Sequence, residues 1–285
     1  MNITRKTFLR MGLAAVAGLA VTPSALLAQG RKKYVFATEG AFPPFNMTRP
    51  NGELYGFELD MLAEIAKRAD FDYEVIAQAW DGMIQGLIDG KYNGVIDSVS
   101  VTDKRLEVVD FSLPYTTGGS TFAVMKESGI ELPGAGTFVD LDDAAATDAA
   151  IAAIAKVLNG KTVGVHVSTI QFDFLNKYLA DKGVTIRSYQ TGPEVYQDLT
   201  NGRLDAGMAS VTNISAFLEK NVETATATGP SFMGGVMGRG AAIVVQKGDK
   251  KLAGLLSKGL KEMSDDGTLA DLSNKWFGMV VTPTL

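Results

Sequence analysis

A gapless internal repeat narrows the folds open to this chain. Residues 87–98 read LIDGKYNGVIDS, and residues 199–210, which lie 112 positions later, read LTNGRLDAGMAS. In each copy the end of an apolar-periodic helix leads through a glycine, a basic residue and a polar turn into an apolar strand. Helix–glycine–strand units occur in any α/β protein, so the alternative is that the match reflects α/β structure in general. Twelve aligned positions favour two similar α/β lobes, with Ser98 and Ser210 at equivalent strand ends.

The rest of the sequence alternates between strand and helix patterns. Residues 57–69 predict an amphipathic helix, with Glu64 and Arg68 four positions apart on its outer face. Asp81 can cap the helix before the first repeat, and Pro193 can occupy the first turn of the helix before the second. We also expect strands at 34–38, 73–77, 162–166 and 185–189, and helices at 169–181 and about 141–158, the last as a surface addition. These patterns indicate an α/β fold in which each lobe is a mixed sheet flanked by helices, with the ligand in the cleft between the lobes.

The first 28 residues have the pattern of a secretory signal peptide. Three basic residues, Arg5, Lys6 and Arg10, precede an apolar stretch at 11–21, and a small-residue site ends at Ala28. The alternative is a membrane anchor, for which the apolar stretch is short and rich in glycine and alanine. The segment also resembles a twin-arginine export signal in which Lys6 replaces the second arginine, so the export route stays open. We expect removal of residues 1–28 and a mature protein that is soluble outside the cytoplasm.

Composition excludes several classes of function. The chain has 32 acidic and 27 basic residues, whereas a general nucleic-acid-binding protein needs a basic surface. It has no cysteine, which excludes disulfides, zinc–thiolate sites, iron–sulfur clusters and a cysteine nucleophile. The single histidine, His166, argues against histidine-rich metal sites and against a serine–histidine–aspartate triad. Composition therefore argues against a metal site and a nucleic-acid partner. We also expect no cofactor and no catalytic residues.

One segment has the pattern of an anion-binding site. Thr102 is a candidate N-cap, which places Arg105 in the first turn of a helix, where a cation faces the positive end of the helix dipole. A bound anion would relieve this conflict. Free backbone N–H groups, the hydroxyls of Ser98 and Ser100, and the guanidinium together suit a carboxylate. The alternative is that Arg105 is solvated or pairs with the acidic residue at 103 or 107.

Several short stretches of the sequence form a recognisable set. They are Ala37–Phe45 (ATEGAFPPF), Gly56–Asp60 (GFELD), Trp80–Ile84 (WDGMI), Ser98–Arg105 (SVSVTDKR), Asp110–Tyr115 (DFSLPY), and Asp266–Thr268 with Lys275–Phe277. Any one of them is a weak signal, but together they are specific. Across residues 31–279 the chain resembles the periplasmic amino-acid-binding proteins of ABC importers, solute-binding protein family 3. The resemblance implies a hinged clamshell of two lobes, the type II periplasmic-binding-protein fold, which closes on its ligand.

The resemblance also implies a ligand site made by both lobes. Arg105 matches the residue that holds the ligand's α-carboxylate, and Ser98 and Ser100 match polar contacts in the first lobe. Thr169 matches the carboxylate contact of the second lobe, although the alignment there is loose by one residue.

Three further positions match contacts to the rest of the ligand. Phe42 and Trp80 match the aromatic pair that sandwiches the ligand's aliphatic part; the alternative is that they are core aromatics. Glu39 matches an acid that meets the side-chain cation in the proteins that bind basic amino acids. Its alternative is a carboxylate that only shapes a turn.

The main departure from the family's pattern is at Ser210. The family usually has an aspartate there, which neutralises the ligand's α-ammonium, and a serine supplies no charge. Strand alternation points Asp97 to the other face of its strand, away from this corner. His166 ends a strand near the cleft and receives no role.

Three functions of different classes are compatible with the resemblance. We expect a binding protein that captures a small polar solute with a carboxylate, most readily a cationic amino acid or a derivative such as an opine, and docks as a monomer on an inner-membrane ABC permease. An enzyme resembling cyclohexadienyl dehydratase is the runner-up, because such enzymes share the scaffold, but the acid position has become Ser210. A sensory ligand-binding domain is the third, and the chain shows no fused signalling module.

The resemblance divides the chain into a signal peptide and two lobes. Gly238 and Gly240 would let the backbone rotate at one of two hinge crossings. The expected parts are the signal peptide at 1–28, lobe 1 at 29–118 and 240–285, lobe 2 at 119–239, and hinge crossings near 116–121 and 236–242.

Overall fold

The computed structural model describes residues 31–285, so the expected signal peptide at 1–28 lies outside the described residues. The strands are β1 (Lys33–Thr38), β2 (Ala41–Phe42), β3 (Asn46–Thr48), β4 (Leu54–Tyr55), β5 (Asp72–Ala77), β6 (Gly94–Val95), β7 (Val109–Thr116), β8 (Ser120–Met125), β9 (Phe138–Asp140), β10 (Thr162–His166), β11 (Thr185–Tyr189), β12 (Ala206–Ser210), β13 (Ala225–Met233) and β14 (Ala241–Gln246). The helices are α1 (Phe57–Ala69), α2 (Met83–Ile88), α3 (Asp103–Leu106), α4 (Ala144–Leu158), α5 (Ile170–Tyr178), α6 (Gly192–Thr200), α7 (Val211–Lys220), α8 (Lys250–Asp265) and α9 (Thr268–Phe277), with short 3₁₀ turns at 126–128, 180–182 and 235–237. Within residues 31–285, no helix is both long and apolar enough to cross a membrane.

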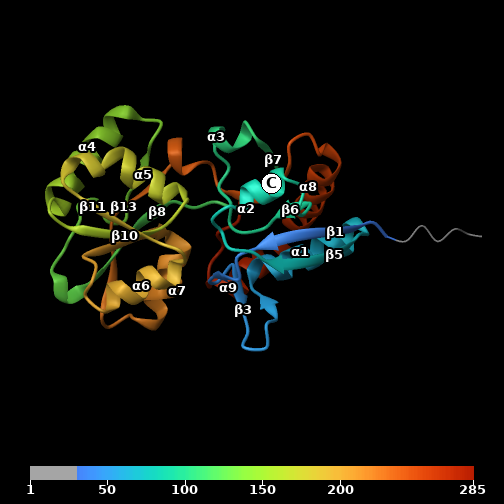
Figure 1. The fold of residues 1–285 in the computed structure, drawn as a ribbon, viewed down its shortest axis with the longest axis horizontal. Helices are drawn as coiled ribbons and strands as arrows, with labels where there is room; N and C mark the ends of the chain where they lie inside the picture. The colour runs from blue at the N-terminus through green and yellow to red at the C-terminus, as the bar shows by residue number, and fades with distance from the viewer. Residues whose placement is uncertain (1–30) are drawn as a thin grey trace, which may run out of the picture. The chain divides into compact units, whose positions relative to one another are not determined.

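A five-stranded mixed sheet forms one half of the described chain. Its order is β5-β1-β6-β14-β7, with β1 parallel to both β5 and β6, and β14 antiparallel to its neighbours. Side chains alternate between its faces along β14: Ile243 and Val245 pack in the core under α1, α8 and α9, and Val244 packs in the core that includes α2. Helices therefore cover both faces of this sheet (Figure 1).

A six-stranded mixed sheet forms the other half, in the order β11-β10-β12-β8-β13-β9. Along β8, Phe122 and Val124 pack in the core that contains α4 and α5, whereas Ala123 and Met125 pack in the core that contains α6 and α7. In Figure 1 these two helix pairs lie on opposite sides of the sheet. The mixed α/β fold predicted from the sequence, with two sheets flanked by helices, is confirmed.

The internal repeat corresponds to equivalent positions in the two sheets. Strand β6 lies parallel to β1 and antiparallel to β14, and strand β12 lies parallel to β10 and antiparallel to β8. The serines that end the two repeats are not equivalent in backbone, however. Ser210 is the last residue of β12, whereas β6 ends at Val95, and Ser98 follows it in a left-handed conformation with φ of 48°. The expectation of equivalent strand ends is thus wrong for Ser98.

Most element bounds follow the sequence patterns closely. Helix α1 and strands β10 and β11 have the predicted bounds, and Pro193 lies in the first turn of α6. Asp81 does not cap α2: Gly82 is the N-cap, and the Asp81 carboxylate accepts the hydroxyl of Ser168 at 2.9 Å. Helix α4 is more than a surface addition, because it contributes Ile154 to the core of the six-stranded sheet.

The chain passes twice between the two sheets. Residues 117–119 connect β7 to β8, and residues 234–240 connect β13 to β14. Gly240 has φ of 97° and a Cβ there would lie 2.3 Å from the Thr116 carbonyl oxygen, so the two connections run in close contact. The two connections overlap the segments expected as hinges, near 116–121 and 236–242; a hinge role and the lobe boundaries stay predictions.

Candidate ligand-binding site

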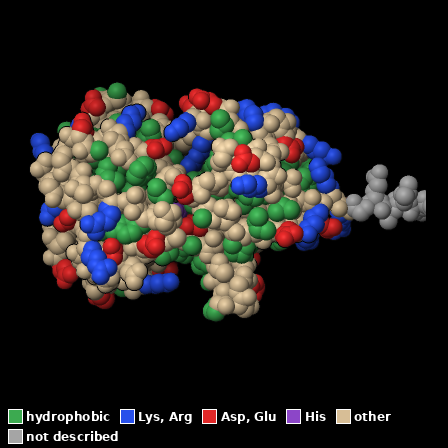
Figure 2. All heavy atoms as spheres, viewed as in Figure 1, with side chains coloured by type: hydrophobic (Ala, Val, Ile, Leu, Met, Phe, Trp, Pro, Cys, Tyr) green, Lys and Arg blue, Asp and Glu red, His purple; other side chains and the backbone are tan. Residues whose placement is uncertain are grey.

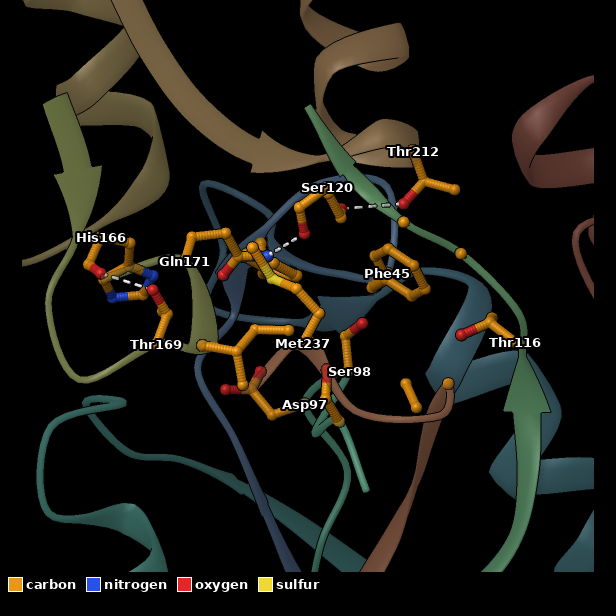
Figure 3. A pocket seen from close by; sticks show the side chains of 18 of the residues that line it. Phe45, Asp97, Ser98, Thr116, Ser120, His166, Thr169, Gln171, Thr212 and Met237 are labelled. Carbon is orange, nitrogen blue, oxygen red and sulfur yellow. Dashed lines mark hydrogen bonds between the residues drawn. The ribbon is translucent and has the colours of Figure 1, made fainter. Parts of the chain in front are cut away.

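One pocket is lined by all eight residues that the sequence singles out. It contains about 720 Å³ of space free of protein atoms, part of it continuous with solvent. The predicted residues that line it are Glu39, Phe42, Trp80, Ser98, Ser100, Arg105, Thr169 and Ser210. Residues that the sequence did not single out include Asp97, Thr116, Ser120, His166, Gln171, Thr212 and Met237, several of which Figure 3 shows around the cavity. The structure therefore brings the predicted set together; their ligand contacts stay a prediction.

Arg105 lies in the pocket wall without an acidic partner. Thr102 caps α3 by accepting the Arg105 backbone N–H at 3.3 Å, as predicted. The guanidinium donates from Nη1 to the Ser100 carbonyl oxygen at 2.9 Å, and its Cζ lies 5.4 Å from the centre of the Trp80 ring. Among residues 31–285 no carboxylate approaches it within 4.0 Å, and Asp103 instead lies 3.7 Å from Arg239.

Desolvation lowers the pKa of Arg105 to about 10, because burial disfavours the charged form. Because no carboxylate of residues 31–285 lies within 4.0 Å of the guanidinium, the alternative of an ion pair with the acid at 103 or 107 is wrong. A partly buried cation with one backbone acceptor would be stabilised by the carboxylate of a bound ligand.

Ser98 is held in its left-handed conformation by a buried acid. Its backbone N–H donates to Glu58 Oε1 at 2.6 Å, and the Tyr115 hydroxyl oxygen lies 3.1 Å from the same nitrogen. Tyr115 also donates its O–H to Glu58, and Asn46 Nδ2 donates to Glu58 Oε2 at 2.8 Å. Burial raises the pKa of Glu58 to about 7. The sequence analysis missed Glu58. Its position on the apolar face of α1, three residues before Met61, could have indicated a buried acid.

The two predicted aromatics are both core and pocket residues. Trp80 is 7% exposed, packs in the core near α2 and donates its indole N–H to the Ser168 carbonyl oxygen at 3.2 Å. Phe42 stacks on Phe45 with ring centres 5.8 Å apart. Both rings also line the cavity. The two alternatives for these residues are therefore compatible.

The wall from the six-stranded sheet is built at the start of α5. Thr169 caps this helix by accepting the Phe172 N–H at 3.2 Å, and its hydroxyl donates to the His166 carbonyl oxygen at 2.7 Å. This hydroxyl thus has two partners within the helix cap, and its contact to a ligand stays a prediction. Gln171 Nε2 donates to Ser120 Oγ at 2.8 Å, and Figure 3 shows this pair at the cavity wall. No feature of the sequence pointed to Ser120.

At the corner around Ser210, no carboxylate among the described residues is free to pair with a ligand's α-ammonium. Ser210 caps α7 by accepting the Asn213 N–H at 3.2 Å, and its hydroxyl lies 3.0 Å from that of Thr212. Asp97 lines the pocket, contrary to the strand-alternation argument, because the chain leaves β6 two residues before it.

Asp97 nevertheless does not replace the missing acid. Its Oδ1 accepts the Glu39 N–H at 3.0 Å and Asn46 Nδ2 at 2.8 Å, and the Thr38 hydroxyl lies 3.3 Å from it. Burial raises the pKa of Asp97 to about 6. Asp97 therefore holds the Glu39 backbone in place.

The carboxyl group of Glu39 is buried and has no hydrogen bond to any described residue. Neither carboxyl oxygen has a hydrogen-bond partner, and the nearest basic group is His166 Nε2, 3.7 Å from Oε1. Burial, reinforced by the nearby charges of Asp97 and Glu194, raises the pKa of Glu39 to about 8. Among the described residues, the pocket thus contains a cation, Arg105, with no carboxylate within 4.0 Å, and an acid, Glu39, whose nearest basic group is His166.

Two α/β halves that share one charged pocket at their junction define a ligand-binding protein of the two-lobe, type II class. The family model of the bacterial extracellular solute-binding proteins, family 3, matches residues 34–279. The chain belongs to this family and is a substrate-binding protein.

Relatives and solved structures agree with this assignment. The octopine-binding periplasmic protein of Rhizobium meliloti is 36% identical, covering 98% of this chain and 99% of the relative. The histidine-binding periplasmic protein of Escherichia coli K12 is 30% identical, covering 84% of this chain and 85% of the relative. The structure of an ancestral arginine-binding protein bound to arginine has a TM-score of 0.73 at 30% identity, covering 87% of this chain and 99% of that one.

Proposed function

We propose that this protein captures a small solute with a carboxylate, an amino acid or an amino-acid derivative, and delivers it to an ABC permease. The single observation that carries this proposal is the guanidinium of Arg105, which lies in the pocket wall with no carboxylate within 4.0 Å among the described residues. A ligand carboxylate there would form charge-assisted, bidentate hydrogen bonds. The relatives named for octopine, cystine and histidine all take ligands that carry a carboxylate.

Within this class we propose an opine of a cationic amino acid as the ligand, with the free cationic amino acid as the alternative. In an opine the α-nitrogen carries a second, carboxylate-bearing arm. An aspartate at position 210 would repel that arm, whereas the uncharged side chains of Ser210 and Thr212 would not. Glu39 supplies an acid for the cationic end of the ligand.

We place the mature protein in the periplasm, as a monomer freed of residues 1–28. The relatives are named as periplasmic proteins, which supports this location. We propose closure about the connections 117–119 and 234–240, with lobe 1 at 29–118 and 240–285 and lobe 2 at 119–239. Each half supplies part of the pocket, so the closed form gains ligand contacts that an open form lacks.

We infer binding without catalysis. A dehydratase-like function is the competing outcome, because the ancestral binding protein AncCDT-1, described as a precursor of cyclohexadienyl dehydratase, is 25% identical with a TM-score of 0.71. On the face of the described residues that Figure 2 shows, acidic and basic side chains are mixed.

Thermal shift followed by calorimetry tests the proposal. The probes are octopine, arginine, lysine, histidine and, as a neutral control, leucine. A tight ligand raises the unfolding temperature because it binds only the folded state. We expect octopine to give the largest shift, arginine a smaller one and leucine none. Binding of none of these carboxylates, or conversion of a bound one into product by mass spectrometry, would overturn the proposed function.

A further inference from the structure

A second cavity, here called the rear groove, lies at the junction of the two sheets. It contains about 1590 Å³ of space free of protein atoms, part of it open to solvent. One wall comes from β9, β13 and α7, which belong to the half with the six-stranded sheet. The other wall comes from the end of α9 and from residues 279–281, which follow it in the half with the five-stranded sheet. The proposed function makes no use of this groove.

The connection 117–119 separates the rear groove from the ligand pocket. All three of its residues line both cavities. Next to this connection, neighbours in the sequence divide between the cavities: Ser120 lines the ligand pocket and Thr121 the rear groove. In the same way, Ser210 lines the ligand pocket and Val211 the rear groove. The two cavities therefore lie on opposite sides of one hinge segment, and a rotation about it that widens one narrows the other.

On the side of the ligand pocket, the two halves are in direct contact. The Trp80 indole N–H donates to the Ser168 carbonyl oxygen at 3.2 Å, and the Ser168 hydroxyl donates to the Asp81 carboxylate at 2.9 Å. These bonds join the loop before α2 to the loop before α5. The ligand side of the hinge is thus closed, which places the rear groove at the wide end of its range.

The wide groove leaves large apolar side chains in contact with water. Phe138 is 72% exposed on one wall, and Met279 and Val280 are 54% and 56% exposed on the other. Among the described residues that line the groove, only Glu219 carries a charge. Bringing the walls together would bury apolar surface, which is favourable, and would desolvate few charged groups.

Each wall is held firmly in its own half. Phe138 lies in β9 and pairs with Ser231 of β13. On the other wall, the Val281 carbonyl oxygen accepts the Thr117 backbone N–H at 2.8 Å, and the Val281 N–H donates to Ser273 Oγ of α9 at 2.8 Å. The walls therefore follow the rotation of their halves, and residues 279–281 are fixed against the hinge connection itself.

We propose that Phe138 packs on Met279 and Val280 when the two halves open, and that this contact, the rear latch, stabilises the open, ligand-free form. The inference rests on the proposed closure about 117–119 and 234–240. The latch lowers the apparent affinity for ligand, because the apparent dissociation constant is the intrinsic one divided by the fraction of protein that is closed. It also keeps the ligand pocket of the empty protein accessible.

Cross-linking tests the geometry of the latch. The double variant Phe138→Cys, Val280→Cys of the full mature protein is treated with a short, reducible thiol-reactive linker, with and without saturating octopine or arginine. We expect linkage to be at least about fivefold slower with ligand, because the ligand depletes the open form. The linked protein should not bind these ligands and should bind them again after the linker is reduced. Each single variant is the control, and a rate that stays equal or increases with ligand would overturn the latch.

Phe138→Ser tests the effect of the latch on affinity. Phe138 is mostly exposed in the closed form, so thermal stability should change little, whereas the apparent affinity for octopine or arginine should rise about three- to tenfold. The radius of gyration of the ligand-free protein should decrease. Ala216→Trp, which adds bulk to the α7 wall of the groove, should act in the same direction by keeping the walls apart.

Val222→Ser is the matched control, because Val222 is also an exposed apolar residue of the same half but lines neither cavity. It should bind as the wild type does. Unchanged or weaker binding by Phe138→Ser would overturn the latch while leaving the proposed function intact. Failure of every carboxylate probe to bind the wild-type protein would overturn the proposed function itself.

Discussion

Glu58 Oε1 accepts the backbone N–H of Ser98 at 2.6 Å, so the second residue of α1 fixes the conformation of a pocket loop 40 positions later in the chain. Ser98 lies there with φ of 48°, a region that non-glycine residues adopt at some cost. The buried acid, Tyr115 and Asn46 together offset this cost. The pocket loop is thus positioned by the helix core rather than by its own sequence.

Tyr115→Phe tests this support. The substitution removes the hydroxyl that donates to Glu58 and leaves the buried acid with one donor fewer. We expect the free energy of unfolding to fall by about 1–3 kcal/mol and ligand affinity to fall with it, because Ser98 moves. Chemical denaturation and calorimetry measure the two effects. Tyr178→Phe, in α5 of the other half, is the matched control; an equal loss there would contradict a specific role for the Tyr115 hydroxyl.

Arg105→Ala should remove ligand binding while leaving the fold intact. A carboxylate that loses its bidentate partner in a closed pocket loses about 2–5 kcal/mol, roughly 30- to 5,000-fold in affinity. Thermal stability should change little, because no protein carboxylate within 4.0 Å depends on this guanidinium. Lys104→Ala removes a neighbouring exposed cation on the same short helix and should bind normally. Near-native binding by Arg105→Ala would show that the guanidinium is not a ligand contact.

Ser210→Asp should exchange the ligand preference. An aspartate also caps helices well, so α7 should form normally. Its charge would attract a free α-ammonium and repel the second carboxylate of an opine. We expect each effect to change the affinity for the corresponding ligand at least about tenfold. We therefore expect weaker octopine binding and stronger arginine binding by calorimetry. Parallel changes for both ligands would argue against an opine arm near Ser210.

The ligand-free protein should lose stability as the pH rises from about 5 to 8. Burial raises the pKa of Glu39 to about 8, of Glu58 to about 7 and of Asp97 to about 6, so the folded state binds more protons than the unfolded state in this window. Stability that depends on those protons is complete below their unfolded pKa values and is lost as the pH rises through the folded ones. Each such proton contributes a slope of about 1.4 kcal/mol per pH unit.

Thermal unfolding from pH 4 to 8.5 measures this slope. Glu39→Gln should flatten it most strongly between pH 6 and 8. Asp110 acts in the opposite sense at low pH, because Lys250 lowers its pKa to about 2 and its contribution is lost as the pH falls towards that value. A melting temperature that increases steadily from pH 5 to 8 would contradict the raised pKa values.

Closure of the two halves can be measured with cysteines, because the chain has none of its own. The Asp81 carboxylate accepts the Ser168 hydroxyl at 2.9 Å, joining the loop before α2 to the loop before α5. We expect the double variant Asp81→Cys, Ser168→Cys to be joined by a short thiol-reactive linker faster with octopine than without it, since the ligand favours the closed form. Each single variant is the control. An unchanged rate at saturating ligand would indicate a preformed pocket.

Much of the local structure could be predicted, because it depends on neighbours in the sequence. Apolar periodicity gave the bounds of α1, and the Thr102 hydroxyl was predicted as the cap that it forms. The direction of Asp97 could not be predicted, because it depends on where β6 stops. The end of β6 is set by its pairing with β1 and β14 and by the hydrogen bond from the Ser98 N–H to Glu58.

The sequence by itself determined the fold class and the repeat, and its resemblance to a known family implied the set of residues around the pocket. Periodicity, caps and short motifs encode these features within a few turns of chain. Only the tertiary structure decided the charge state of the site. Glu39 and His166 lie 127 positions apart, and neither the absence of a hydrogen-bond partner nor the burial that favours their neutral forms exists until the two sheets meet. Desolvation is a property of the packed molecule, because it depends on every group that excludes water.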